Sequence, residues 1–72
     1  MRLAIPQHPM HDFIVRLIID SGGDPESDEV IVKVVSAQDK HAAVEVARRL
    51  VRHEEAEKAA RIWAWSVTRS RR

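Results

Sequence analysis

The stretch Phe13-Ile14-Val15-Arg16-Leu17-Ile18-Ile19 is apolar at both odd and even positions, and Val30-Ile31-Val32-Lys33-Val34-Val35 shows the same pattern. Successive side chains of a strand point to opposite faces of the sheet, so each stretch predicts a strand that is apolar on both faces. The rest of the sequence contains one good helix, which covers one face only. The chain therefore has more apolar sheet surface than its helix covers, and this predicts a partner.

The chain is short, with 72 residues, and it contains no cysteine. A domain of this length buries about 60% of its unfolded surface, and such proteins often gain stability from disulfides, metals or oligomerisation. The lack of cysteine excludes disulfides and thiolate metal sites. We therefore expect a homodimer without a cofactor, with a well-packed monomer as the alternative.

The sequence also predicts where the protein resides. No stretch approaches the ~20 apolar residues of a membrane span. Residues 1–6 lack the continuous apolar segment of a signal peptide. We expect a soluble, cytoplasmic protein that does not contact a membrane.

The chain divides into an arm, one domain and a tail. Residues 1–11 contain Pro6 and Pro9 and predict an irregular N-terminal arm, and residues 69–72 form a basic C-terminal tail. Residues 12–68 form the domain, in which a loop dense in turn-forming residues joins two strands. The predicted elements are a strand over 11–20, a loop over 21–28, a strand over 29–37, a helix from 40 to about 58 and a strand over 62–68.

The helix has a clear start and a narrow apolar face. Asp39 is the predicted N-cap, because its carboxylate can accept hydrogen bonds from the free amides of the first turn. Apolar residues recur at helical spacing, namely Ala42, Ala43, Val46, Ala47, Leu50 and Val51. Their small size favours close packing on a sheet. An alternative is one longer helix that continues through Trp65.

The predicted fold class is α+β, with the order β-β-α-β. It consists of a small three-stranded, mostly antiparallel sheet with one helix packed on one face. The third strand lies either beside the second or antiparallel to the first, and the spatial order 2-1-3 is favoured because all neighbours are then antiparallel. In the third strand, alternation places Trp63, Trp65 and Val67 on one face and Ile62, Ala64 and Ser66 on the other.

The apolar residues expected on the face opposite the helix are Ile14, Ile18 and Ile31. In the second strand we assign Val30, Val32 and Val34 to the helix side, and a bulge near residues 34–36 would reconcile this with Ala37 before the helix. The cover of the opposite face is either a second copy of the chain or the arm, through Leu3, Ile5 and Met10.

Charged residues form two groups although the net charge is only +1. Residues 20–29 contain five acids and no base, and three arginines lie close together on the helix. Such separation can steer association with a charged partner. The candidate partner-binding residues are Asp24, Glu26, Asp28, Arg48, Arg49 and Arg52.

Motifs for catalysis and for metal binding are missing from the sequence. It contains no P-loop, no G-x-G-x-x-G and no G-x-S-x-G motif, and no acid and base have opposed environments. The acidic loop lacks the ligand spacing of a calcium loop. His41 and His53 lie about 18 Å apart along a helix and cannot share one ion. We therefore expect neither an enzyme nor a metal site.

Nucleic-acid binding is the alternative to protein binding. The arginine-rich helix face and the basic tail form a weak electrostatic footprint, and two tryptophans could stack on bases. The residues involved, besides the helix arginines, are Arg69, Arg71, Arg72, Trp63 and Trp65.

The junction Val35-Ser36-Ala37-Gln38-Asp39-Lys40-His41-Ala42, with a further alanine at Ala47, resembles a strand-to-helix junction of small α+β proteins. Proteins of this size and layout are similar to those encoded by phages and mobile elements, including anti-CRISPR inhibitors. The resemblance implies an inhibitor that blocks a bacterial immune nucleoprotein complex by surface contact, and it assigns no functional residue. We therefore expect a non-enzymatic protein-binding module.

Overall fold

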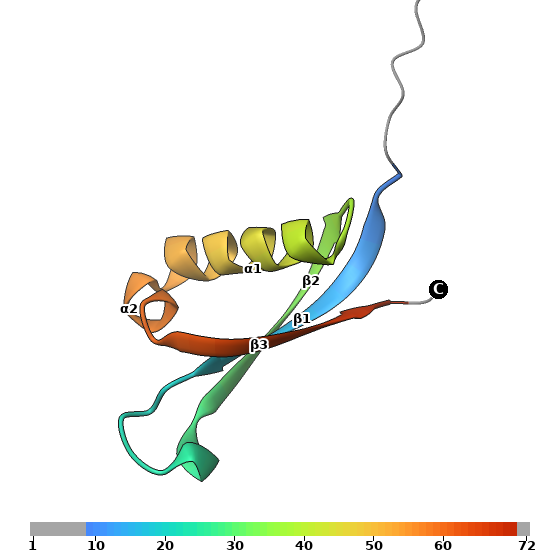
Figure 1. Cartoon of the computed structure of the whole chain (residues 1–72). Coiled ribbons are helices and arrows are strands. Elements are labelled where there is room, and N and C mark those ends of the chain that lie inside the picture. Colours follow the sequence, from blue (N-terminus) through green and yellow to red (C-terminus); the bar gives the residue numbers. More distant parts are fainter. Residues whose placement is uncertain (1–8, 71–72) are drawn as a thin grey trace, which may run out of the picture.

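The structure is a computed structural model that describes residues 9–70. Its elements are β1 (His11–Ile19), the 3-10 turn η1 (Pro25–Ser27), β2 (Glu29–Ala37), α1 (Lys40–Glu54), α2 (Ala56–Ala59) and β3 (Ile62–Arg69). The three strands form one sheet, and α1 lies across one of its faces (Figure 1). The predicted α+β fold is therefore confirmed, while most of the arm, with Leu3 and Ile5, and the tail residues Arg71 and Arg72 lie outside the described residues.

Strand β1 is the centre of the sheet. The strand order is β2-β1-β3, and β1 is antiparallel to both neighbours. Its pairing with β2 is continuous, from His11 opposite Ala37 to Ile19 opposite Glu29. The predicted order 2-1-3 is confirmed, and β2 and β3 are both edge strands.

The core lies between β1 and α1. Alternate residues of β1 are at most 3% exposed, namely Phe13, Val15, Leu17 and Ile19. From α1 the core receives Ala43, Val44, Ala47 and Val51. Two of these four are alanines without any exposed surface. Small side chains at these positions let the helix axis approach the sheet, as the sequence predicts.

The helical segment begins as predicted and ends at Ala59, close to the predicted end, but it is interrupted at Glu55. The Oδ1 atom of Asp39 accepts a hydrogen bond from the backbone N–H of Ala42 at 2.8 Å, so Asp39 is the N-cap. Helix α1 ends at Glu54, because the next residue, Glu55, has the non-helical angles φ −147° and ψ 79°, and the short α2 follows. The alternative of one helix through Trp65 is wrong. That helix would deprive one side of β1 of its backbone hydrogen-bond partners.

A β-bulge in β3 changes which side chains face the helix. The pairing of β3 with β1 skips from Ala64 to Ile62, so Trp63 is an extra residue without a partner. Because of this extra residue, Ile62 and Val67 both pack against the core. Strict alternation would place these two residues on opposite faces. The prediction that Ile62 lies on the face opposite Val67 is therefore wrong. Val67 lies on the same face as Trp65, as predicted.

Strand β2 contains no bulge, and this reverses the predicted assignment of its faces. Ile31 packs against the core on the helix side, so its predicted place on the opposite face is wrong. The residues on that face are Val30, Val32 and Val34. The reason is Ala37, which is buried below the start of α1 at 2% exposure and fixes the parity of a regular strand.

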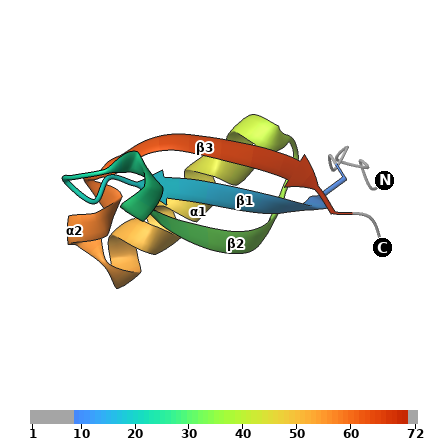
Figure 2. The ribbon, with the colours of Figure 1, turned by 90° about the horizontal axis from the view of Figure 1, so that it is seen from below.

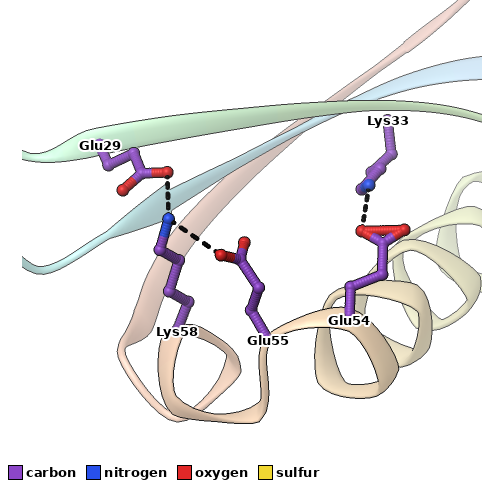
Figure 3. A network of polar contacts seen from close by, with 5 residues as sticks. All are labelled: Glu29, Lys33, Glu54, Glu55 and Lys58. Carbon is purple, nitrogen blue, oxygen red and sulfur yellow. Dashed lines mark hydrogen bonds and ion pairs between the residues drawn. The ribbon is translucent and has the colours of Figure 1, made fainter.

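Two lysines connect β2 to the C-terminal part of the helical segment. Lys33 Nζ lies 2.6 Å from Glu54 Oε1, and Lys58 Nζ lies 2.9 Å from Glu29 Oε2 (Figure 3). Lys58 also lies 3.3 Å from Glu55 Oε1. The hydrogen bond to Glu29, together with that to Glu55, raises the pKa of Lys58 above its ordinary value. These contacts hold the end of α1 and the whole of α2 against the β2 side of the sheet.

The position of the core predicts that replacing two different leucines by alanine has very different effects on the free energy of unfolding. Leu17 of β1 has no exposed surface, whereas Leu50 of α1 is 40% exposed. The substitution Leu17→Ala should lower the free energy of unfolding by about 3 kcal/mol, because it leaves a cavity under the helix. Leu50→Ala should lower it by less than about 1 kcal/mol. Urea unfolding followed by circular dichroism measures both, and equal losses would contradict this placement of the core.

Candidate functional site

On the face of the sheet opposite α1, the part formed by β1 and β2 is largely apolar and uncovered. Figure 2 shows the sheet from below, with α1 behind the strands. Val30, Val32 and Val34 on this face are 52%, 52% and 64% exposed. Ile14 and Ile18 of β1 are half-buried beside them. We call these five residues the open face, and nothing in residues 9–70 packs over it.

The pairing of β1 with β2 makes the open face continuous. Ile14 lies opposite Val34 and Ile18 lies opposite Val30. Between these two pairs, the exposed Arg16 lies opposite Val32 and places one positive charge within the apolar surface. Scattered apolar residues are normal on a protein surface, but a continuous patch marks a site of interaction. Of the predicted arm residues, only Met10 is described, and it is 59% exposed.

A second surface lies on the helix side of the sheet. A groove of about 380 Å³ separates the N-terminal half of α1 from β3. Its lining residues are Lys40, His41, Val44, Glu45 and Arg48 of α1 and Trp65, Ser66 and Val67 of β3. The groove is polar and positively charged on the helix wall, and it is apolar at Val44 and Val67. We call it the edge groove.

The predicted arginines and one of the tryptophans meet at this groove. The guanidinium carbon of Arg48 lies 5.4 Å from the ring centroid of Trp65, which is a cation–π distance. Arg49 and Arg52 line a neighbouring hollow of about 300 Å³, together with Glu45 and Arg48. The helix arginines therefore form a continuous positive strip next to the edge groove.

The other residues proposed for nucleic-acid binding lie elsewhere. The indole N–H of Trp63 donates a hydrogen bond to Asp28 Oδ2 at 2.9 Å, so Trp63 is tied to the acidic loop. Arg69 belongs to β3, and its Nη2 atom lies 2.8 Å from His11 Nδ1. The structure therefore brings Trp65 to the arginines and separates Trp63 from them.

Three carboxylates of the acidic loop, residues 20–29, accept hydrogen bonds from within the loop, namely those of Asp20, Asp24 and Asp28. Asp28 Oδ1 accepts hydrogen bonds from the backbone N–H and the hydroxyl of Ser21, both at 3.0 Å. Asp24 caps η1 by accepting from the backbone N–H of Glu26 at 3.1 Å. Asp20 Oδ1 accepts from Gly22 N–H at 2.9 Å, where Gly22 has a φ of 83° that favours glycine. The residues proposed as an acidic contact surface thus also shape the loop.

Neither a cluster of metal ligands nor a membrane-spanning helix is found among residues 9–70. Within residues 9–70 no three His, Asp or Glu side chains come close enough to hold a metal ion together. In the same part of the chain, no helix has the length and apolar character needed to cross a bilayer.

Sequence reasoning missed the edge groove. It placed the arginines on the exposed side of the helix and the tryptophans in the last strand, but it did not bring these elements together. The missing information is where α1 crosses the sheet, which depends on the packing of Ala43 and Ala47 and on the ion pairs at β2. No local signal in the sequence reports that crossing.

Comparison with known proteins adds no relative. No protein-family model matches the chain, and neither the curated proteins nor the solved structures provide a match. The resemblance to anti-CRISPR inhibitors therefore stays a prediction.

The contact between Asp28 and Trp63 predicts a change at acid pH. The backbone N–H of Ser21, assisted by the Ser21 hydroxyl and the Trp63 indole, lowers the pKa of Asp28 below its ordinary value of 3.8. Because the folded pKa is lowered, this stabilising contact is complete above the ordinary value and is lost as pH falls through the folded value. We expect the indole N–H resonance of Trp63 to shift with a midpoint below 3.8.

An acid titration followed by NMR tests this expectation. The indole resonance of Trp65 is the internal control, since Trp65 contacts Arg48 and no carboxylate of the loop. Asp28→Asn should remove the titration of the Trp63 resonance. A midpoint at or above the ordinary carboxyl value, or equal shifts of both indoles, would contradict the contact.

Proposed function

We propose that this chain is a non-enzymatic protein-binding module that acts by surface contact, and that its open face is the contact surface. The observation that carries the proposal is the continuous apolar strip of β-branched side chains on the open face. Three of its valines are more than half exposed in a chain with a small core. Burial of apolar surface contributes about 25 cal/mol per Å², so covering this strip makes the free energy of binding more favourable.

The shape and chemistry of the open face favour a polypeptide surface. Side chains of a sheet stand in rows, and a second layer of apolar side chains can pack on them about 10 Å away. Arg16 lies between the two Ile–Val pairs, where it would meet an acid or a backbone carbonyl of the partner. A positive charge within an apolar contact selects among partners, because an unpaired buried charge is costly.

A second copy of the chain is the first partner to consider. The two inner faces of a β-sandwich are layers of the same kind, and the open face is such a layer. A homodimer built in this way covers both open faces at once, as expected for an interface with two-fold symmetry. The same face would serve a macromolecular target if the chain acts as an inhibitor.

Nucleic-acid binding is the weaker candidate. Only Trp65 lies beside the helix arginines, and one face of its ring already lies under Arg48. Trp63 is hydrogen-bonded to an acidic residue, next to carboxylates that repel phosphate. The site therefore lacks the row of free aromatic faces on which successive bases stack.

A lysine on the open face should abolish the proposed contact. We expect the chain to sediment as a dimer at micromolar concentration and Val32→Lys to sediment as a monomer, because the buried ammonium has no partner. Leu50→Lys is the matched control, since it also replaces an exposed apolar residue by lysine but lies on α1. Circular dichroism verifies that both variants are folded.

Photo-crosslinking extends the test to partners other than a second copy. A benzoyl-phenylalanine at position 32 should form a covalent bond to another polypeptide in the cells that express the chain, whereas one at position 50 should not. The Val32 crosslink should vanish when Val30 and Val34 are both replaced by lysine. A monomeric chain that forms no intermolecular crosslink from position 32 would overturn the proposal.

A further inference from the structure

We propose that the edge groove accepts an extended acidic peptide segment, which adds to β3 as a fourth strand. This site lies at the edge and on the helix side of the sheet, whereas the open face lies opposite the helix. The inference therefore does not depend on the proposed function, and both surfaces can be occupied at the same time.

Strand β3 offers the backbone groups that such a segment needs. Seven of its eight residues pair with β1 on one side, and no strand among residues 9–70 pairs with it on the other. A free edge presents N–H and C=O groups in the spacing of a further strand. Extended peptides bind to many domains by this kind of addition, in which the backbone gives affinity and alternate side chains give specificity.

The edge groove receives the alternate side chains. Residues of an added strand point in turn to the open side and to the helix side of the sheet. Those on the helix side would enter the groove, whose volume of about 380 Å³ has room for several side-chain groups. Val44 and Val67 provide an apolar floor, and Trp65 forms part of the wall. A small apolar residue at the centre of the peptide fits this floor.

The charges around the groove select an acidic peptide. Lys40 and Arg48 line it, and Arg49 and Arg52 continue the positive strip. Among residues 9–70 no carboxylate forms an ion pair with any of these four side chains. The single acid in the lining, Glu45, lies 3.5 Å from His41 Nε2. Unpaired cations beside a free strand edge favour carboxylates on the peptide.

The other edge of the sheet lacks these features. On the helix side of β2, Lys33 and Glu29 are already paired with Glu54 and Lys58. Figure 3 shows these pairs closing the space between β2 and the helical segment. The groove and its two lining cations, Lys40 and Arg48, lie between α1 and β3, so the peptide site is at β3.

A designed set of three peptides tests backbone pairing and charge separately. The probe is a capped seven-residue peptide with a Thr-Val-Thr centre and two acidic residues on each side. The first control has the same sequence with an N-methyl group on every residue, so that it keeps the charges but has no backbone N–H to donate on either edge of a strand. The second control replaces the acids by lysines. A single-stranded oligonucleotide of eight thymidines provides the nucleic-acid arm.

NMR titration of the full chain locates and measures the binding. The acidic probe should shift the backbone resonances of β3 and of residues 40–48, and it should slow hydrogen exchange along β3. Arg48→Ala should weaken the binding by about threefold to fivefold. Arg16→Ala removes the same charge from the open face, and it should change the affinity by less than about 1.5-fold.

Several results would overturn the inference. They are equal binding of the N-methylated peptide, equal binding of the lysine peptide, shifts confined to the open face, and binding of the oligonucleotide with no binding of the acidic peptide. Thermal unfolding of Arg48→Ala shows that a loss of affinity does not come from unfolding. If that variant is unstable, Arg49→Gln replaces it, with a smaller expected loss in the same direction.

Discussion

The packing of β1 against α1 is the interaction on which the rest of the structure depends. β1 is paired with a strand on both sides and is therefore the middle strand of the sheet. Its alternate residues on the helix side lie at the centre of the apolar core that α1 covers. The two fully buried alanines of α1 bring the helix close enough to seal that core. Because α1 covers this face of the sheet, it leaves the opposite face uncovered. The exposed valines of β2 are a direct consequence, because the same strands that build the core carry β-branched residues on their other side.

Patterns within a few residues of each other were readable from the sequence. The loop of turn formers, the cap at Asp39 and the small face of the helix follow from local chemistry, and the structure confirms them. The order 2-1-3 follows instead from the general preference for antiparallel neighbours, and it is confirmed as well. The incorrect predictions concern the faces of β2 and β3, and each face depends on a shift of the strand by one residue. One extra residue at Trp63 moves Ile62 into the core, and the parity of β2 places Ile31 there as well. A bulge leaves the composition of a strand unchanged, so the sequence gives no sign of it.

The distribution of charge has a structural explanation. Carboxylates between β1 and β2 accept hydrogen bonds from their own loop, and two lysines are paired with the glutamates that surround them. Four cations without an ion pair among the described residues, Lys40, Arg48, Arg49 and Arg52, lie on α1, and the first two line the groove beside β3. The molecule thus has two surfaces of different chemistry. The open face is apolar, and the edge groove, on the helix side of the sheet, is lined by cations. Two surfaces of different chemistry can in this way share a core of ten residues.

The lysine in the middle of β2 also bears on the tendency of this edge strand to pair with further copies. β2 is an edge strand with three exposed valines, and such a strand tends to recruit further copies into a growing fibre. Lys33 lies in the middle of β2 and points toward the helix, where its ammonium group is bound. A further strand of the same sequence, laid beside β2 in register, would place a second lysine next to the first. Like charges directly opposite each other destabilise a strand pair, so Lys33 disfavours the addition of a second β2 at this edge.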